Sequence, residues 1–291
     1  MLIANEYSHR PLLAIALLSH PRRILTTARN ESIAPPVAKE RIAKFLARAG
    51  VASRRESERL IEAGRVMLNG AVVASPATLV DSKDLLVVDG KAIARPEPTR
   101  LWRYHKPAGL VTTARDPEGR PTVFATLPKN LPRVLSVGRL DINTEGLLLL
   151  TNDGGLARFL EHPDQGFSRT YRIRAFGDVN ELAIAQLANG VTVDGINYRP
   201  VRTTLDRRGN SNCWLTMTLN EGKNREIKIL LQHIGLSVTR LIRTGYGPFD
   251  LGKVAPGEAE EVPVRQLPGL LPGYFSSQGL LPARRIVVAR Q

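Results

Sequence analysis

A chain of 291 residues exceeds the usual size of one hydrophobic core and predicts two domains, with 43% hydrophobic and 23% charged residues as in ordinary soluble proteins. Its 41 Lys and Arg against 27 Asp and Glu, a net charge of +14, favour nucleic acid as the partner, because neutralised phosphates release counterions. Cys213 is the only cysteine, which excludes an intrachain disulfide or a multi-cysteine zinc site and fits a reducing cytoplasm.

The sequence lacks the common motifs for binding a metal ion or a nucleotide cofactor. The five histidines show no metal-ligand spacing, and the sequence has neither a Walker motif nor a G-x-G-x-x-G motif set between a strand and a helix. We therefore expect no metal and no cofactor. An anionic membrane would also attract a basic chain, but no long basic amphipathic helix stands out, so no membrane partner is expected.

Residues 1–38 contain only two acidic residues, Glu6 and Glu31. The apolar stretch from Pro11 to Leu18 is short and lacks a clear signal-peptide cleavage site. We interpret residues 1–38 as a disordered extension. An Arg-bearing transit peptide and a start codon placed too far upstream are the alternatives.

Residues 39–94 carry the pattern of a small domain of helices and hairpins. Apolar residues at helical spacing predict a first helix that starts near Arg41 and that Gly50 ends. A capping-box pattern over Ser53 to Glu56 opens a second helix. Asn69-Gly70 and Asp89-Gly90 each follow a short apolar run and predict two hairpins. Basic side chains on the two helices are expected to contact RNA phosphate, with a solvated helix face as the alternative: Arg41, Lys44, Arg48, Arg55 and Arg59.

The remaining chain predicts an α+β domain. Residues 95–100 form a stiff, polar, proline-containing linker. Over residues 101–267, β-rich runs alternate with two helical runs, about 179–188 and 224–233, which favours a mostly antiparallel sheet. From residue 268 to 291 the Pro-Gly pairs and the final basic residues predict a loop-like basic tail.

The most informative stretch runs from Gly138 to Gly154 and reads GRLDINTEGLLLLTNDG. The four leucines are too few to span a membrane, which needs about 20 apolar residues. Because Gly146 and the Asn-Asp-Gly turn bound them, they predict a strand buried on both faces. Asp141 then lies on a loop at the edge of a rigid element, where a catalytic group can be held. A buried strand preceded by a merely solvated turn is the alternative.

This stretch resembles the signature of the RsuA-like pseudouridine synthases, G-R-L-D-x-x-T-E-G-L-L-L-L-T-N-D-G, at every fixed position over seventeen consecutive residues. The resemblance implies that Asp141 is the catalytic carboxylate. Pseudouridine formation breaks the C–N glycosidic bond of uridine, turns the base and rejoins it through carbon, without cofactor or energy source. A carboxylate can attack the anomeric carbon, add to the base or abstract a sugar proton, and the sequence leaves these roles open.

Further motifs of the same family match this chain. Tyr171, in RTYRI, corresponds to the tyrosine that packs against the flipped base. Lys228 corresponds to the basic residue that pairs with the catalytic carboxylate, where many relatives carry Arg, and Glu226 stands where relatives often carry Gln. Leu241 corresponds to the apolar residue of the uracil pocket. Arg139 is expected to contact RNA phosphate or to order the loop that carries Asp141.

Two other segments complete the resemblance. Residues 44–55 and 64–70 resemble the alpha-L RNA-binding domain, a match that covers about residues 40–93 and implies docking of structured RNA. The motif from Tyr104 to Thr112 matches the family's opening motif, in which Lys106-Pro107 is interpreted as a structural strand-to-turn element.

The function implied by the resemblance is isomerisation of one uridine in ribosomal RNA, after flipping of the base. Details of residues 221–226 favour the large-subunit (23S) branch, similar to synthase B. A small-subunit (16S) synthase and a non-catalytic RNA-binding ribosome-assembly factor are the alternatives, and a nucleoside-cleaving enzyme is disfavoured because a docking domain would be superfluous. The expected partner is ribosomal RNA, free or in a pre-ribosomal particle, bound by a monomer without a protein partner.

Overall fold

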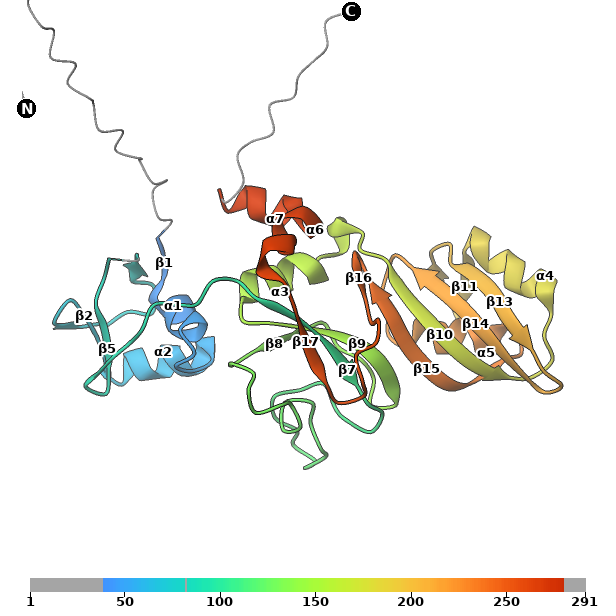
Figure 1. The fold of residues 1–291 in the computed structure, drawn as a ribbon, viewed down its shortest axis with the longest axis horizontal. Helices are drawn as coiled ribbons and strands as arrows, with labels where there is room; N and C mark the ends of the chain where they lie inside the picture. The colour runs from blue at the N-terminus through green and yellow to red at the C-terminus, as the bar shows by residue number, and fades with distance from the viewer. Residues whose placement is uncertain (1–38, 82, 280–291) are drawn as a thin grey trace, which may run out of the picture. The chain divides into compact units, whose positions relative to one another are not determined.

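The computed structural model describes residues 39–81 and 83–279 (Figure 1). The extension expected over residues 1–38 and the end of the basic tail, residues 280–291, lie outside this described part. Within the described part, no helix is long and apolar enough to cross a membrane.

Residues 39–94 form two helices and a small antiparallel sheet around one hydrophobic core. Strands β3, β2, β5 and β6 pair in this order, and β1 pairs separately with β4. Fully buried Ile42, Leu46 and Val66 join the helices to this sheet. The elements are β1 Glu40–Arg41, α1 Ile42–Arg48, α2 Arg54–Glu62, β2 Val66–Leu68, β3 Ala71–Val72, β4 Leu79–Val80, β5 Leu86–Val88 and β6 Lys91–Ala92.

The local signals of this domain are confirmed with one correction. The Ser53 hydroxyl accepts a hydrogen bond of 3.2 Å from the Glu56 backbone N–H and caps α2. Asn69 and Gly70 have φ values of +50° and +87°, the left-handed pair that a tight hairpin requires. Arg41, expected on the first helix, instead lies in β1 opposite Leu79, and its extended backbone makes it the N-cap residue of α1.

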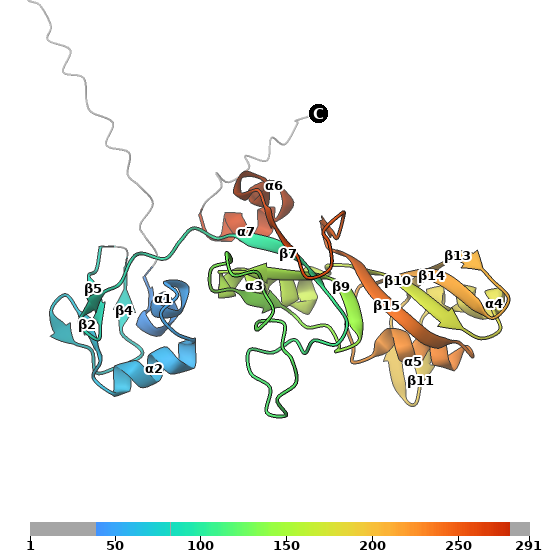
Figure 2. The same ribbon diagram turned by 60° about the horizontal axis from the view of Figure 1, so that its bottom comes forward.

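Residues from Leu101 onward build a nine-stranded sheet whose main order is β13-β14-β10-β15-β9-β7-β17. Strand β8 pairs with β9, and β16 pairs with β15. The pairing of β9 with β15 is parallel and the other ladders of this sheet are antiparallel, so the expected α+β fold with a mostly antiparallel sheet is confirmed (Figure 1, Figure 2). The strands are β7 Leu101–Lys106, β8 Leu135–Val137, β9 Thr144–Thr151, β10 Arg169–Phe176, β13 Arg202–Arg208, β14 Asn212–Leu219, β15 Ser237–Tyr246, β16 Phe249–Asp250 and β17 Ala259–Val262. A separate hairpin joins β11 Val191–Val193 to β12 Ile196–Tyr198.

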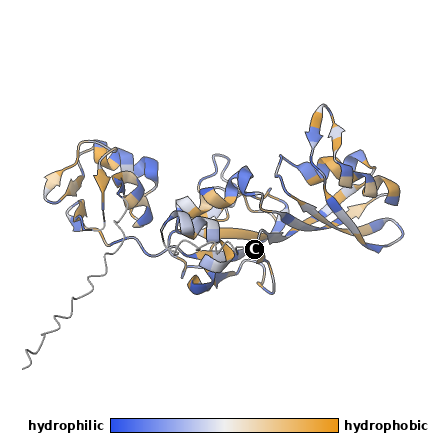
Figure 3. Cartoon of the chain, turned by 90° about the horizontal axis from the view of Figure 1, so that it is seen from above, coloured by the Kyte–Doolittle hydropathy of each residue, from blue (hydrophilic) through white to orange (hydrophobic). Residues whose placement is uncertain are grey.

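The leucine run forms the buried strand that the sequence predicts. Leu147 to Leu150 lie in β9 with no solvent-exposed area. Leu147 and Leu149 pack into one hydrophobic core, whereas Leu148 and Leu150 pack into another on the opposite face. Strand β14, which lies between β13 and β10, is buried on one face instead, because buried and partly exposed residues alternate along it. Figure 3 shows hydrophobic and hydrophilic residues interspersed along the ribbon of the chain.

Helices cover this sheet at positions that the sequence only partly reveals. The two expected helices are present, as α4 Glu181–Gln186 and α5 Glu226–His233. Helix α3, Gly154–Glu161, was not expected, because its two starting glycines are poor helix formers. The Asp153 side chain compensates: its Oδ1 accepts a hydrogen bond of 2.8 Å from the Gly155 N–H and caps the helix.

The loop-like tail expected from residue 268 is wrong for its first part. Helices α6, Leu267–Leu270, and α7, Pro272–Ser277, follow the sheet. Leu267, Leu271, Tyr274 and Phe275 are buried in the same core as Leu147 and Leu149. Burial of these side chains outweighs the helix-breaking tendency of the intervening Pro and Gly residues.

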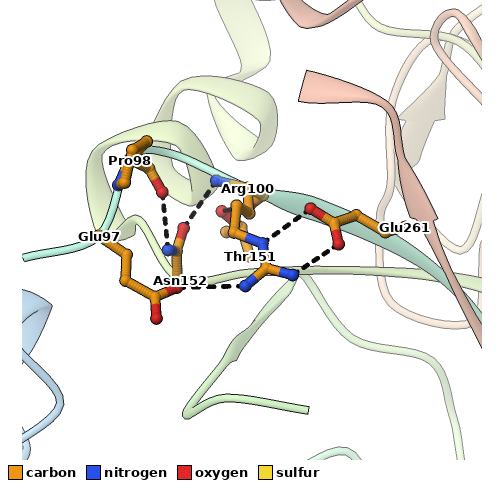
Figure 4. Close-up of polar contacts among 6 residues, drawn as sticks. All are labelled: Glu97, Pro98, Arg100, Thr151, Asn152 and Glu261. Carbon is orange, nitrogen blue, oxygen red and sulfur yellow. Dashed lines mark hydrogen bonds and ion pairs between the residues drawn. The ribbon is translucent and has the colours of Figure 1, made fainter. Parts of the chain in front are cut away.

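The end of the linker is bound to the body of the larger domain (Figure 4). The Asn152 side chain accepts a hydrogen bond from the Arg100 N–H at 2.8 Å and donates one to the Pro98 carbonyl oxygen at 2.9 Å. The Arg100 guanidinium donates two hydrogen bonds to Glu261, at 2.7 and 2.6 Å, and one to Glu97 at 3.2 Å. The sequence indicates Asn152 only as a turn residue. In the structure its side chain also binds the linker, through hydrogen bonds to the backbone groups of Pro98 and Arg100.

Candidate active site

A cleft of about 910 Å³ opens where β9, β10 and β15 meet the start of α5. Its walls are the loops 111–117 and 138–142, the loop 221–225 and the first turn of α5. Five residues predicted from the sequence as site residues line it together: Arg139, Asp141, Tyr171, Lys228 and Leu241. The tertiary structure therefore gathers side chains that lie far apart in the chain.

Asp141 and Lys228 face each other in this cleft. The Nζ atom of Lys228 lies 3.8 Å from the Oδ2 atom of Asp141, an ion-pair distance that is too long for a hydrogen bond. The Lys228 side chain is 26% exposed and the Asp141 side chain is 43% exposed, so a substrate can reach the carboxylate. Lysine also lacks the planar fork with which arginine donates two parallel hydrogen bonds to a carboxylate.

Lys106 fixes the loop that carries Asp141 through hydrogen bonds to backbone carbonyl groups. This lysine is fully buried at the end of β7, and its Nζ donates hydrogen bonds to the carbonyl oxygens of Pro107, Ile142 and Thr144 at 3.0, 3.0 and 2.9 Å. Burial lowers the pKa of Lys106 to about 8, and the carboxylates of Asp141 and Glu145 oppose this shift. The predicted structural role of Lys106-Pro107 thus has a specific form, which is the binding of loop carbonyl groups.

Thr112 and Gly109 add further bonds to the same loop. The Thr112 hydroxyl donates to the Leu140 carbonyl oxygen at 2.9 Å and accepts from the Leu140 N–H at 3.3 Å. The Gly109 N–H donates to the Ile142 carbonyl oxygen at 2.7 Å. The segment 106–112 therefore fixes the loop on both sides of Asp141.

The parallel pair β9–β15 forms the floor of the cleft. Its register places Leu241 opposite Thr144 and Arg243 opposite Gly146, so Leu241 comes next to the base of the Asp141 loop. Leu241 is 7% exposed and lines the cleft. A Cβ atom at Gly146 would lie 2.8 Å from the backbone nitrogen of Arg243, so this close approach requires glycine.

Tyr171 enters the cleft from β10, where it pairs with Arg243 of β15. The ring is half-buried and packs against two hydrophobic cores, one under α5 and one beside β7. Such packing restrains the ring while part of it remains accessible from the cleft, the arrangement needed for stacking on a base.

Several functional candidates in the cleft were missed by sequence reasoning. Arg169 and Arg243 lie over the Tyr246 ring, with guanidinium carbons 5.0 and 5.1 Å from its centroid. Arg243 is 2% exposed, and its Nη2 has no hydrogen-bond partner among residues 39–81 and 83–279. Their positions within β-rich runs gave no signal, because the sequence does not show which face of a strand borders a cleft.

Glu226 is a buried acid at the start of α5. Its Oε2 accepts a hydrogen bond of 3.0 Å from the Lys223 N–H, and burial raises its pKa to about 7, with the neighbouring Glu221 carboxylate acting in the same direction. The Lys223 Nζ pairs with Glu221 at 2.8 Å and also donates to the Asn197 carbonyl oxygen at 2.6 Å, which ties this loop to the β11–β12 hairpin.

None of the basic residues predicted on the N-terminal domain lines the cleft. Glu40 pairs with Lys44 at 3.1 Å and with Arg48 at 2.8 Å, so part of this positive charge is neutralised within the domain. Arg55 and Arg59 are exposed on α2, and neither makes an ion pair within the described part of the chain. Across residues 39–81 and 83–279, no cluster of three or more His, Cys, Asp or Glu side chains is placed to hold a metal ion.

Comparisons with known proteins agree with this architecture. A family model described as RNA pseudouridylate synthase matches residues 100–233, and an S4 domain model matches residues 40–86. An uncharacterized RNA pseudouridine synthase of Rickettsia bellii (strain RML369-C) is 48% identical over 223 residues, which cover 77% of this chain and 96% of the relative. The ribosomal large subunit pseudouridine synthase B of Salmonella typhi is 43% identical over 228 residues, 75% of this chain and 77% of that protein. A crystal structure of a pseudouridylate synthase superimposes with a TM-score of 0.55 at 25% identity, covering 79% of this chain and 99% of the other.

Proposed function

This chain belongs to the RsuA-like family of RNA pseudouridine synthases, and we propose that it isomerises one uridine of large-subunit (23S) ribosomal RNA with Asp141 as the catalytic carboxylate. The observation that supports this assignment is the cleft in which Asp141, Lys228, Tyr171 and Leu241 converge on one space. The choice of large-subunit RNA follows the name of the Salmonella typhi relative.

In the proposed mechanism the target uridine leaves its stack and enters the cleft. Unstacking costs a few kcal/mol, and stacking on the Tyr171 ring returns about 1–3 kcal/mol. Leu241 provides an apolar contact for the uracil. Each of these contacts holds the base within reach of the carboxylate on the 138–142 loop.

The chemistry balances within the nucleotide. The bond from C1′ to N1 breaks, the base turns, and a bond from C1′ to C5 forms, after which the proton on C5 is lost and N1 gains a proton. An ionised Asp141 serves this sequence by acting on the sugar or the base and by accepting a proton. Lys228, whose Nζ lies 3.8 Å from the carboxylate, offsets negative charge that develops near it.

The test is Asp141→Asn, which keeps the shape of the side chain but removes the ionised oxygen. Tritium release from 5-tritiated uridine in 23S RNA should fall to background, while RNA affinity stays within a few fold. Asp164→Asn, at a carboxylate that is 84% exposed, is the matched control and should keep full turnover. Substantial turnover by Asp141→Asn would remove this residue from the catalytic role.

The substrate is tested separately by mapping pseudouridines in ribosomal RNA from a deletion strain. Loss of one 23S pseudouridine, restored by the wild-type gene and not by the Asp141→Asn gene, is the expected result. Loss of a 16S pseudouridine instead would assign the enzyme to the small subunit. Unchanged maps of both RNAs would contradict ribosomal RNA as the substrate.

A further inference from the structure

A second concave surface continues from the cleft along the outer side of α5. This groove has a volume of about 420 Å³ and shares Arg225 and Lys228 with the cleft. Gln232 and Ser237 add polar groups farther along. The lining contains two cations and no carboxylate, so its charge is complementary to a phosphodiester strand.

Arg225, at the junction of cleft and groove, has an unusual backbone. It is the N-cap residue of α5 and adopts the left-handed conformation, with φ 53° and ψ 25°, and its side chain makes no capping hydrogen bond. Among the described residues, the other non-glycine residues with positive φ are Asn69, Asp89 and Asp194, types that tolerate this conformation. An arginine pays a steric penalty that glycine would avoid, which points to a use for its side chain.

The Arg225 side chain is also available for a ligand. The residue is exposed, and its guanidinium makes no ion pair or hydrogen bond with the described part of the chain. The two acidic residues near the start of α5 contact Lys223 instead of Arg225: Glu221 forms an ion pair with the Lys223 ammonium group, and Glu226 accepts a hydrogen bond from the Lys223 N–H. A free guanidinium between two concave surfaces can bind a phosphate with two parallel hydrogen bonds.

We propose that Arg225 binds a backbone phosphate of a nucleotide flanking the target uridine, and that the groove along α5 carries this RNA strand out of the cleft. This inference rests on the proposed function, because it assumes that the target nucleotide occupies the cleft beside Asp141. It adds to that function the path of the RNA strand next to the target uridine and the residue that binds a phosphate of this strand. Lys228, shared by both surfaces, stays with Asp141, so Arg225 is the cation that serves the flanking strand.

The experiment compares Arg225→Gly, Arg225→Lys and a charge-matched control, Lys253→Gly, at an exposed turn position outside both concave surfaces. Binding of an unmodified 23S transcript is measured at several salt concentrations. For Arg225→Gly we expect a three- to tenfold loss of affinity and a slope of log K against log salt that is shallower by roughly 0.7 to 0.9, the value for one phosphate contact. Because glycine suits φ 53°, the melting temperature should be unchanged or higher.

Arg225→Lys should keep the salt slope, and Lys253→Gly should keep both affinity and slope. Once the target uridine is mapped, single neutral methylphosphonates at the flanking positions identify the contacted phosphate. One such substitution should weaken binding by the wild-type protein and have no further effect on Arg225→Gly.

Wild-type affinity and slope in Arg225→Gly, or a loss in Arg225→Lys as large as in Arg225→Gly, would overturn the inference. Failure of the inference is distinguishable from failure of the proposed function. If the wild-type protein forms pseudouridine and the Arg225→Gly binding is normal, only the strand path is wrong. If the wild-type protein forms none, the function is wrong.

Discussion

Lys228 reaches from the first turn of α5 to within 3.8 Å of the Asp141 carboxylate, on a loop that precedes β9. The two residues meet because the parallel pair β9–β15 brings the base of that loop beside the strand that follows α5. This relationship carries the first prediction.

Two substitutions of Lys228 should distinguish the effect of its charge on turnover from the effect of its side-chain shape. Lys228→Met removes the cation and should lower turnover roughly 100-fold, a magnitude typical of losing one electrostatic partner at a reacting group. Lys228→Arg keeps the charge and should retain most activity. Single-turnover rates at saturating RNA, with circular dichroism to check the fold, make the comparison. Equal rates for Lys228→Met and the wild type would show that the pair has no role in the chemistry.

The Tyr171 ring is expected to act by stacking rather than through its hydroxyl. Tyr171→Phe should therefore keep near-normal turnover, whereas Tyr171→Ala loses about 1–3 kcal/mol of stacking, which corresponds to roughly a fivefold to 150-fold lower rate. The same tritium-release assay reports both variants. A Phe variant as poor as the Ala variant would assign the effect to the hydroxyl group.

Lys106→Met should weaken both stability and activity, because three carbonyl oxygens around the Asp141 loop lose their donor. The expected loss in the free energy of unfolding is about 1–3 kcal/mol, the cost of leaving buried acceptors unpaired. Lys91→Met, at an exposed lysine of β6, is the control and should change stability little.

The pH dependence adds a check on Lys106. Its pKa is lowered from 10.5 to about 8, so between these values the unfolded chain binds more protons than the folded one. The contribution of Lys106 to stability therefore rises with pH over this window. The difference between wild type and Lys106→Met, measured by chemical denaturation, should grow as the pH rises from 8 to 10. A constant difference would contradict the burial argument.

The contribution of Glu226 to stability changes with pH in the opposite direction to that of Lys106. Its pKa is raised from 4.5 to about 7, so the folded protein binds more protons between these values, and the contribution to stability falls as the pH rises through that range. Glu226→Gln should therefore be relatively more stable than the wild type at pH 8 than at pH 5. Denaturation midpoints at both pH values give the comparison, and parallel curves for the two proteins would contradict it.

RNA docking by the N-terminal domain should depend most on Arg55 and Arg59, which make no ion pair with the residues that the structure describes. Arg55→Ala combined with Arg59→Ala should make the salt slope of RNA binding shallower by up to about 1.4 to 1.8. Lys44→Ala combined with Arg48→Ala should have a smaller effect, because Glu40 already pairs with both side chains. Affinity measured over a salt series distinguishes the two pairs. An unchanged slope in the first variant would assign docking to other surfaces.

The sequence predicted well wherever the physical cause is local. The left-handed hairpin at Asn69-Gly70 and the Ser53 cap depend on neighbouring residues, and both are confirmed. The buried character of β9 follows from an uninterrupted leucine run. Helix α3 was missed because its cap comes from a single Asp in a segment that otherwise has the composition of a turn.

The tail was misjudged for a related reason. Pro and Gly near residues 268–273 indicate a loop, yet α6 and α7 form because their apolar side chains are buried against β9. Burial against a distant strand is not visible in a local window.

The sequence by itself determined the family, the α+β class and the short motifs that contain Asp141, Tyr171, Lys228 and Leu241. Only the tertiary structure decided that these side chains share one cleft, that Lys106 holds the Asp141 loop, and that Glu40 neutralises part of the basic face on α1. The physical reason is the separation along the chain of the residues that interact. Turns, caps and buried strands depend on adjacent residues, whereas a cleft, an ion pair across strands and a shifted pKa depend on which surfaces the sheet brings together.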